Sequence, residues 1–311
     1  MSPSSFPLLR LPLLALSAVI EKVADKELIP LSLCSNRMHY VVKRFRNKSM
    51  KLSIGLFWEH SIFIGIHNTI HSDVYITVKS LPEGHLDGWQ TDRIGGKLAY
   101  FQKDRNGFIS YWEDKIYGTK AFVKYMSNLF DARVKLVKFE ENRVWMMDLV
   151  EELQSPGTYT TDINAGNGNG LTDDQFRHVL FQLNPRSLHI RQVPTDEFCI
   201  EQFNKKYDKL TLFEGKWVTI ENLCQLDCTG LVLADRQELT TSEINRFLTH
   251  VLAGGAPRLK IFRGRVQSSN ANLILKGVRK LLTAMPGKDQ FRRANQSWFF
   301  EGKMNRGVDS V

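Results

Sequence analysis

Paired cysteines and histidines are the residues of this chain whose spacing could bind a metal ion. Cys224 and Cys228 are four residues apart, and so are His67 and His71. Such spacing places two side chains on one helix face, but a structural zinc site needs two ligand pairs, and no matching pair follows. The two histidines also lie where strands and turns are predicted. We therefore expect no metal, no cofactor, and buried structural thiols at the two cysteines.

A glycine-rich segment at 162–173, DINAGNGNGLTD, has some features of a calcium-binding loop. Asp162 and Asn164 occupy the first and third positions of an EF-hand loop. However, Asn167 stands where that loop requires glycine, and Asp173 replaces the closing glutamate. No helix pair is expected around the segment, so we interpret it as a flexible connection.

Motifs of known enzyme classes are absent from the sequence. It contains no G-x-S-x-G elbow, H-E-x-x-H helix, Walker loop or kinase signature. We therefore expect no enzymatic activity, and binding is the remaining class of function.

The charge of the chain is positive, at +9, but its 42 basic and 33 acidic residues are interspersed. We interpret the densest basic run as a solvated helix end, whose cations suit the negative end of the helix dipole. A nucleic-acid patch is disfavoured because no aromatic-basic module accompanies the run. The run consists of Lys43, Arg44, Arg46, Lys48 and Lys51.

Sparse cysteines favour a reducing compartment, the cytosol or the nucleus. No stretch approaches 18 consecutive apolar residues, so no transmembrane helix is expected. Leu11–Ile20 resembles the apolar part of a signal peptide, but Pro12 interrupts it and only Arg10 precedes it. A secreted glycoprotein, with acceptor sites at Asn47 and Asn295, is the alternative.

The first 45 residues show the apolar periodicity of three short helices. Residues 13–24 form the first, with Pro12 at its start. Asp25 is expected to cap the second helix, and Ser35 the third. Three helices in about forty residues bury too little apolar surface to be robust alone, so a partner or the remaining chain should complete the unit.

The rest of the chain predicts an α/β fold that begins with β-hairpins. Strand-like segments at 51–58, 61–66, 73–80, 97–103 and 107–112 are separated by turn residues. Helical runs followed by short strands come next, with strand starts about 21 to 29 residues apart, close to the leucine-rich-repeat period. We therefore expect an irregular leucine-rich-repeat-like α/β solenoid, although an ordinary α/β sheet remains possible. The expected strand starts are Val134, Thr158, Ser187, Lys209, Leu231 and Arg258.

Two helix-end signals stand out in the last of these units. Thr241 or Ser242 is expected to cap the helix, with Glu243 close behind, and Gly254 and Gly255 should end it.

Residues 6–45, FPLLRLPLLALSAVIEKVADKELIPLSLCSNRMHYVVKRF, resemble the F-box of the large nematode F-box protein family. The shared features are F-P-L-L-x-L-P, an apolar pair eight residues on, E-L with L-S-L-x-S, and a basic third helix. The resemblance implies that this module docks a Skp-type adaptor, which bridges to a cullin. The partner-binding residues that it implies are Pro7, Leu8, Leu11, Pro12, Val19, Ile20, Leu28 and Leu31.

A second stretch, at about residues 196–262, resembles the type 2 F-box-associated domain of the same family. Its most specific part is LTTSEINRFLTHVLAGGAPRLK at 239–260, although Val251 stands where the family usually has tryptophan. The expected organisation is an F-box at 1–50, a strand-rich then repeat-like region at 51–195, an F-box-associated domain at 196–265, and an extension at 266–311.

Taken together, the two resemblances imply a substrate-recognition adaptor of a Skp-cullin-F-box type ubiquitin ligase, with an unknown protein substrate and no nucleic acid or membrane partner. The alternative is a repeat-type binding protein whose F-box has decayed. Pro30 motivates this alternative because it falls inside the expected second helix, where it removes a backbone hydrogen bond. If that helix instead began near Pro30, Leu28 would move into the preceding loop.

Overall fold

The computed structural model describes most of the chain between residues 8 and 302. The chain divides into two compact units, Met1–Val137 and Lys138–Val311, and each is described by itself. The fold is mixed α/β, with three helices first and the strands after them. The described residues are 8–48, 52–57, 61–65, 74–83, 89–105, 107–140, 143–164, 170–192, 194–213, 217–233, 238–266, 274, 276–277, 283–284, 290–293 and 296–302.

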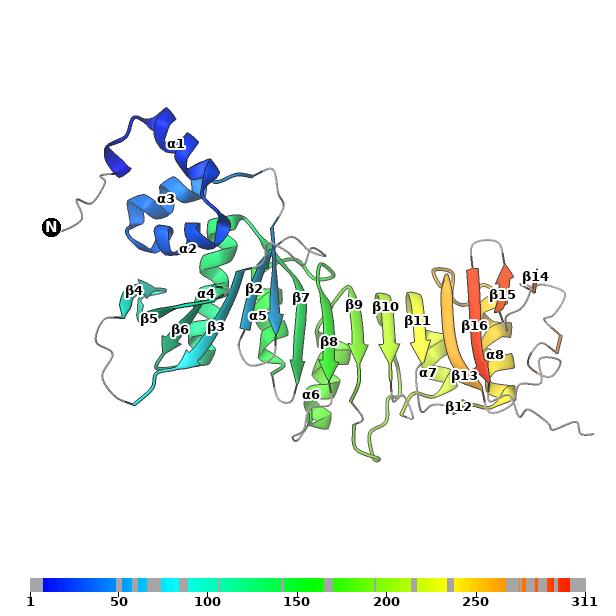
Figure 1. Ribbon diagram of the computed structural model, residues 1–311. Coiled ribbons are helices and arrows are strands. Elements are labelled where there is room, and N and C mark those ends of the chain that lie inside the picture. Colours follow the sequence, from blue (N-terminus) through cyan, green and yellow to red (C-terminus); the bar gives the residue numbers. More distant parts are fainter. Residues whose placement is uncertain are drawn as a thin grey trace, which may run out of the picture. The chain divides into compact units, whose positions relative to one another are not determined.

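The first unit begins with the N-terminal module, residues 8–48, which contains the three predicted helices (Figure 1). Ser35 caps the third helix as expected, because its hydroxyl accepts a hydrogen bond from the Met38 N–H at 3.1 Å. The cap predicted at Asp25 is wrong: Asp25 is the first helical residue, and Ala24 precedes it without a side-chain cap. The elements are a 3-10 turn at Leu8–Arg10, α1 at Leu13–Lys22, α2 at Asp25–Leu33 and α3 at Asn36–Phe45.

Helix α2 continues through Pro30. It begins at Asp25, so the alternative start near Pro30 is wrong, and Leu28 lies within the helix rather than in a loop. Leu28 is fully buried, together with Ile29. Ser32 and Leu33, after the proline, are buried as well, so packing on both sides of Pro30 favours the helix despite the missing backbone donor.

The sheet of the first unit has the strand order β7-β1-β2-β3-β6-β5-β4. The predicted hairpins are confirmed, since β1-β2, β2-β3 and β5-β6 pair antiparallel, whereas β3-β6 and β1-β7 pair parallel. Strand β4 was not predicted. The elements are β1 at Ser53–Phe57, β2 at Ser61–Gly65, β3 at Val74–Ser80, β4 at Gln90–Ile94, β5 at Lys97–Asp104, β6 at Gly107–Trp112, α4 at Lys115–Phe130 and β7 at Arg133–Glu140.

Helix α4 packs closely on this sheet through a glycine. A Cβ atom at Gly118 would lie 2.4 Å from Cγ of Trp112, so no larger residue fits there without a shift. Phe122 of the same helix packs against Phe101 and Phe108 of the sheet, with ring centroids 6.2 and 5.7 Å away. These contacts make α4 the base against which the N-terminal module can pack.

The second unit contains consecutive strands that pair parallel with their neighbours in the order β8-β9-β10-β11-β13-β16, with antiparallel β15 and β14 beyond (Figure 1). Among the described elements, a helix precedes β8, β9, β11 and β13 in sequence. The elements are α5 at Trp145–Leu153, β8 at Thr160–Asn164, α6 at Asp173–Arg177, a π-helical turn at His178–Gln182, β9 at Ser187–Ile190, β10 at Lys206–Leu212, α7 at Ile220–Gln225, β11 at Asp227–Leu233, β12 at Glu238–Leu239, α8 at Thr241–Leu252, β13 at Ile261–Val266, β14 at Thr283–Ala284, β15 at Gln290–Arg293 and β16 at Gln296–Gly302.

The core of the second unit includes a row of aligned apolar residues, one from each of the strands β9, β10, β11 and β13. Leu188, Leu210, Leu231 and Phe262 are paired in register across four strands, and all are buried. Phe247 of α8 packs on this row, with its ring centroid 4.9 Å from that of Phe262. The helices therefore cover this face of the sheet.

The two ends of helix α8 differ in detail from those predicted from the sequence. The cap of α8 is Thr240, not Thr241 or Ser242, and its hydroxyl accepts from the N–H of Glu243. Gly254 ends that helix with a φ of 93°, as expected, whereas Gly255 is not in the left-handed region. The same capping box occurs at Thr172 and Thr219, which the sequence analysis did not recognise.

Candidate functional site

Helix α1 exposes three apolar side chains in the N-terminal module. Leu16 and Ile20, four residues apart, point into the module and are buried. Leu13 and Val19 flank this buried pair around the helix and Leu14 lies on the opposite side, and they are exposed by 58%, 41% and 84%. We call these three the apolar face of α1. A helix that is apolar on both sides normally packs against something on both sides, so this face suits a protein partner.

The predicted partner-binding residues separate into two groups. Leu8, Leu11 and Leu31 are half-buried, and Pro12 and Val19 are exposed. In contrast, Ile20 and Leu28 are fully buried and form part of the module's own core. Pro7 lies outside the described residues. Partner contact stays a prediction for all eight, but only the first group lies at the surface.

Leu13 and Leu14 were missed as site residues. A signal for Leu14 was present in the sequence, because the i, i+4 pair Leu16 and Ile20 defines the inward side of the helix and Leu14 lies opposite it. No such signal exists for Leu13, which precedes Leu16 by three residues and shares its side of the helix.

Helix α3 is tied to the C-terminal end of α4 by a buried cation. The Arg46 side chain is only 6% exposed; its Nε donates to the Leu129 carbonyl at 3.1 Å, and an Nη donates to the Phe130 carbonyl. Burial lowers the pKa of Arg46, while Asp131 and Asp25 oppose that shift. These bonds satisfy carbonyls that the end of a helix leaves without partners, and they fix the module on the sheet of the first unit.

A hydroxyl pair makes a second link between the module and α4. The hydroxyl groups of Ser32 and Tyr125 lie 2.7 Å apart, and Nδ1 of His39 lies 3.1 Å from the same Tyr125 oxygen. Burial raises the pKa of Tyr125 to about 12. Tyr125 therefore stays a neutral hydrogen-bonding group at neutral pH, and the orientation of α2 and α3 on α4 is defined by polar as well as apolar contacts.

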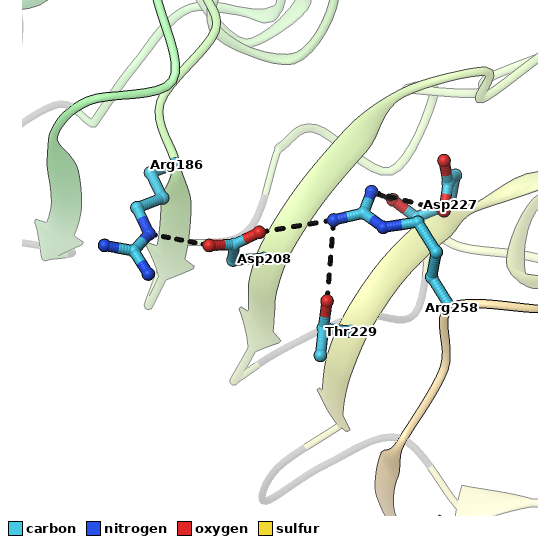
Figure 2. A network of polar contacts seen from close by, with 5 residues as sticks. All are labelled: Arg186, Asp208, Asp227, Thr229 and Arg258. Carbon is cyan, nitrogen blue, oxygen red and sulfur yellow. Dashed lines mark hydrogen bonds and ion pairs between the residues drawn. The ribbon is translucent and has the colours of Figure 1, made fainter.

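A polar network links the starts of four parallel strands of the second unit, β9, β10, β11 and β13 (Figure 2). Nε of Arg186 lies 2.6 Å from one oxygen of Asp208, and Nη2 of Arg258 lies 3.2 Å from the other. Nη1 of Arg258 also pairs with Asp227 at 3.3 Å, and Thr229 accepts a long bond from Arg258. Asp208 lies on β10, and Asp227 and Thr229 lie on β11, while Arg186 and Arg258 lie shortly before β9 and β13. These parallel strands start at the same edge of the sheet, which brings the five side chains together.

The face of this sheet opposite the buried row carries several cations, and we call it the open face. Burial lowers the pKa of His189, and the neighbouring Lys209 and Arg191 lower it further, while Asp162 opposes them. Arg191 stacks on the Phe213 ring, with its guanidinium carbon 4.1 Å from the centroid. The combination of cations, an aromatic ring and a regular sheet surface is suited to binding a polypeptide with acidic side chains.

The candidate metal residues have other structural roles. Cys224 lies on α7 and Cys228 on β11, so the predicted spacing on one helix face is wrong. Burial raises the pKa of the Cys228 thiol to about 12, as expected of a structural thiol. Asp173 of the glycine-rich segment accepts a hydrogen bond from the Thr195 N–H at 3.1 Å.

The described ranges of the chain contain histidine, cysteine and acidic side chains of the kinds that bind metal ions. Within those ranges, no three histidine, cysteine or acidic side chains are grouped suitably. His67, His71 and most of the glycine-rich segment, 165–169, lie outside the described residues. Among the described helices, none combines the length and apolar character needed to cross a bilayer.

Comparison with known families gives one match. Residues 199–263 match the family model described as F-box associated. This stretch runs from the segment before β10 into β13 and includes Asp208, Asp227 and Arg258 of the polar network. The match supports the C-terminal part of the resemblance, while the N-terminal F-box and the nematode origin stay predictions. No curated protein and no solved structure gave a significant match.

Proposed function

We propose that this chain is a substrate-recognition adaptor of a Skp-cullin-F-box type ubiquitin ligase. In this proposal the N-terminal module docks a Skp-type adaptor, and through it a cullin, while the second unit binds the protein substrate. The chain itself catalyses no reaction, and the complex works in the cytosol or nucleus. The observation that carries the proposal is the apolar face of α1, with the F-box-associated match at 199–263 in support.

The energetics of docking favour a contact larger than the apolar face alone. Burying the exposed parts of Leu13, Leu14 and Val19 is worth roughly 3 to 5 kcal/mol. Association costs about 4 to 15 kcal/mol in lost freedom, so further contacts are needed for a stable complex. Pro12 and the half-buried Leu11, which precede α1, are suitably exposed to extend the contact.

The leucine-rich-repeat-like character of the second unit is also part of the proposal. Contacts between neighbouring repeats recur at a separation of 22 residues. The Asn222 side chain donates to the Ile200 carbonyl, and the Phe203 N–H donates to the Gln225 side chain. Repeats of this length that pair strand to strand in parallel support a solenoid, in which a continuous sheet surface is available to a substrate.

The substrate surface in this proposal is the open face together with the polar network. Lys209 provides positive charge there, as does Arg191, which pairs with Asp162 at 3.6 Å, and Ile261 adds an apolar residue that is 47% exposed. Such a surface gives specificity through charge and shape rather than through a short motif.

Copurification with a Skp-type adaptor tests the docking step. The full chain and the adaptor are coexpressed, and adaptor retention is measured for wild type, Leu14→Asp, Val19→Asp and Ile116→Asp. Ile116 lies on α4 and is 41% exposed, as Val19 is, so it is a matched control for placing a charge on an exposed apolar site. We expect wild type and Ile116→Asp to retain the adaptor and both α1 variants to lose it. Equal retention by all four, or by none, contradicts the proposal.

The second candidate is a repeat-type binding protein with a decayed F-box, and Pro30 is the observation that favours it. Pro30 provides no N–H for the fourth residue before it, Lys26, in the middle of α2. Titration of the adaptor against wild type and Pro30→Glu separates the two candidates. Binding by both variants supports the ligase adaptor, whereas binding only after the substitution supports decay.

A further inference from the structure

A basic cavity lies in the first unit, between the end of α3, the end of α4 and the start of β7. Its volume is about 630 Å³, within the range of ligand-binding pockets. Five cationic side chains and a single carboxylate, Asp131, line it. The cationic residues are Lys43, Arg46, Lys48, Arg133 and Lys135.

The negative end of the α4 dipole does not account for all of this charge. Arg46 already donates to the carbonyls of Leu129 and Phe130, which are among the last in the helix. Lys43 donates to Oδ1 of Asn128 at 3.0 Å. One buried guanidinium and one ammonium group are therefore sufficient for this helix end, and the remaining cations are surplus to it.

The surplus cations are Lys48, Arg133 and Lys135. All three are exposed, and their side chains have no hydrogen-bond or ion-pair partner among the described residues. Exposed cations normally spread apart, because like charges close together repel. Their repulsion around one cavity lowers the stability of the folded protein, and a bound anion would remove this repulsion.

The backbone of β7 is irregular where it carries these cations. Ser53 and Ile54 of β1 pair with Arg133 and Val134, but the next residue of β1 pairs with Leu136. Lys135 is therefore an extra residue in a β-bulge. Bulges are rare in parallel pairs, and they commonly redirect a side chain beside a functional site. Arg133 and Lys135 are both exposed and both line the cavity.

We propose that this cavity binds a small anion that carries two or three phosphate groups. The lining residues have a net charge of +4, from five cations and one carboxylate. A phosphate group carries about −1.5 to −2 at neutral pH, so two or three groups neutralise the site, whereas a single carboxylate does not. Arginine contributes a planar donor pair and lysine a point charge, the two donor types that proteins use for phosphate. This site is separate from the apolar face of α1 and does not depend on the proposed ligase role.

Calorimetric titration of the full chain with sodium tripolyphosphate at fixed ionic strength tests this inference. We expect one binding site on wild type and at least tenfold weaker binding to the Arg133→Gln/Lys135→Gln variant. The matched control is Lys22→Gln/Lys79→Gln, which removes the same charge from exposed positions outside the cavity and should bind within twofold of wild type. Circular dichroism verifies that both variants are folded.

Equal weakening in both double variants overturns the proposal, because it indicates attraction to net charge alone. Absence of tripolyphosphate binding to wild type, or binding of a single-stranded oligonucleotide in its place, also overturns it. Vesicles with and without a bisphosphorylated phosphoinositide distinguish the source of the phosphate groups. Recruitment that depends on the phosphoinositide and on Arg133 and Lys135 identifies a lipid headgroup as the ligand, and binding of tripolyphosphate without recruitment identifies a soluble one.

Discussion

The N-terminal module and the parallel sheet of the second unit present opposite kinds of surface. In the module, α1 buries Leu16 and Ile20 but leaves Leu13 and Leu14 in solvent. In the sheet, the apolar row is covered by helices, and the network around Arg258 provides polar side chains with partners within the chain. An apolar surface without a cover gains free energy when a partner buries it, whereas a paired polar surface gains little and selects by geometry. In the proposed function, the first region would therefore provide affinity and the second selectivity.

The largest expected change in the free energy of unfolding comes from a substitution in the apolar core of the second unit, which the helices cover. Phe247→Ala removes a ring that is 1% exposed and packs on Phe262, so it should lower the free energy of unfolding by about 3 to 5 kcal/mol. Urea denaturation followed by circular dichroism measures this change. A loss below about 1 kcal/mol would show that the row of apolar residues is not the core that the comparison requires.

A smaller effect is expected from the polar network. Arg258→Met removes the pairs with Asp208 and Asp227, whose side chains are about 30 to 45% exposed. Solvent screens such pairs, so the coupling energy between Arg258 and Asp208 should be about 0.2 to 1 kcal/mol and should fall with added salt. A double-mutant cycle with Asp208→Asn measures it.

Arg186 is the matched control for that cycle, because it pairs with the other oxygen of Asp208. Its side chain is 63% exposed against 31% for Arg258, so its coupling energy should be the smaller of the two. If the coupling energy of Arg186 with Asp208 were instead the larger, burial would not determine the strength of these ion pairs.

The strand-rich part of the fold was predictable from sequence wherever side chains alternate. The segments at 73–80 and 107–112 became β3 and β6 because every second residue is buried, and all of these residues except Ser110 are apolar. Strand β4, QTDRI, was missed because only Ile94 among its five residues is buried, so pairing with β5 defines it rather than an apolar pattern. Helix α5 was also missed, although Met146, Met147, Leu149 and Val150 are all buried.

The candidate surfaces were only partly predictable. Pattern recognition identified α1 but not which of its sides faces solvent, and so selected the buried Ile20 and overlooked Leu14. The basic run at 43–51 was interpreted as a solvated helix end, which fits Lys43 and Arg44 in the last turn of α3. Arg46 is instead buried and binds carbonyls of α4. The contribution of Arg133 and Lys135 to the same cavity could not be predicted, because it depends on the pairing of β7 with β1, two strands far apart in sequence.

The stability of the second unit should depend on pH through His178. Nε2 of His178 lies 2.8 Å from Asp148, and Nδ1 lies 2.7 Å from the Gln182 side chain. Burial alone would lower the pKa of His178, but the hydrogen bonds and the charge of Asp148 raise it above its ordinary value of 6.5. A pKa that is raised on folding stabilises the protein fully below about pH 6.5, and this stabilisation is lost as pH rises through the folded-state pKa.

Replacement of His178 should therefore lower the free energy of unfolding more at acidic pH than at basic pH. We expect the difference in unfolding free energy between wild type and His178→Gln to be larger at about pH 6 than at about pH 8, and below about 1 kcal/mol at both, since the pair is partly exposed. Urea denaturation at the two pH values measures this. Asp148→Asn serves as the control that should remove the same pH dependence, and a larger difference at the higher pH would contradict the pairing.

The smallest effect on stability is expected at the residue with the largest expected effect on docking. Leu14 is 84% exposed, so Leu14→Ala removes few contacts, and alanine is at least as favourable in a helix. The free energy of unfolding should change by less than about 0.5 kcal/mol. Adaptor retention should nevertheless fall, because the lost side chain would be buried only in the complex. If stability fell by more than about 2 kcal/mol, Leu14 would belong to the module's core, and the contrast between an uncovered and a covered apolar surface would not hold.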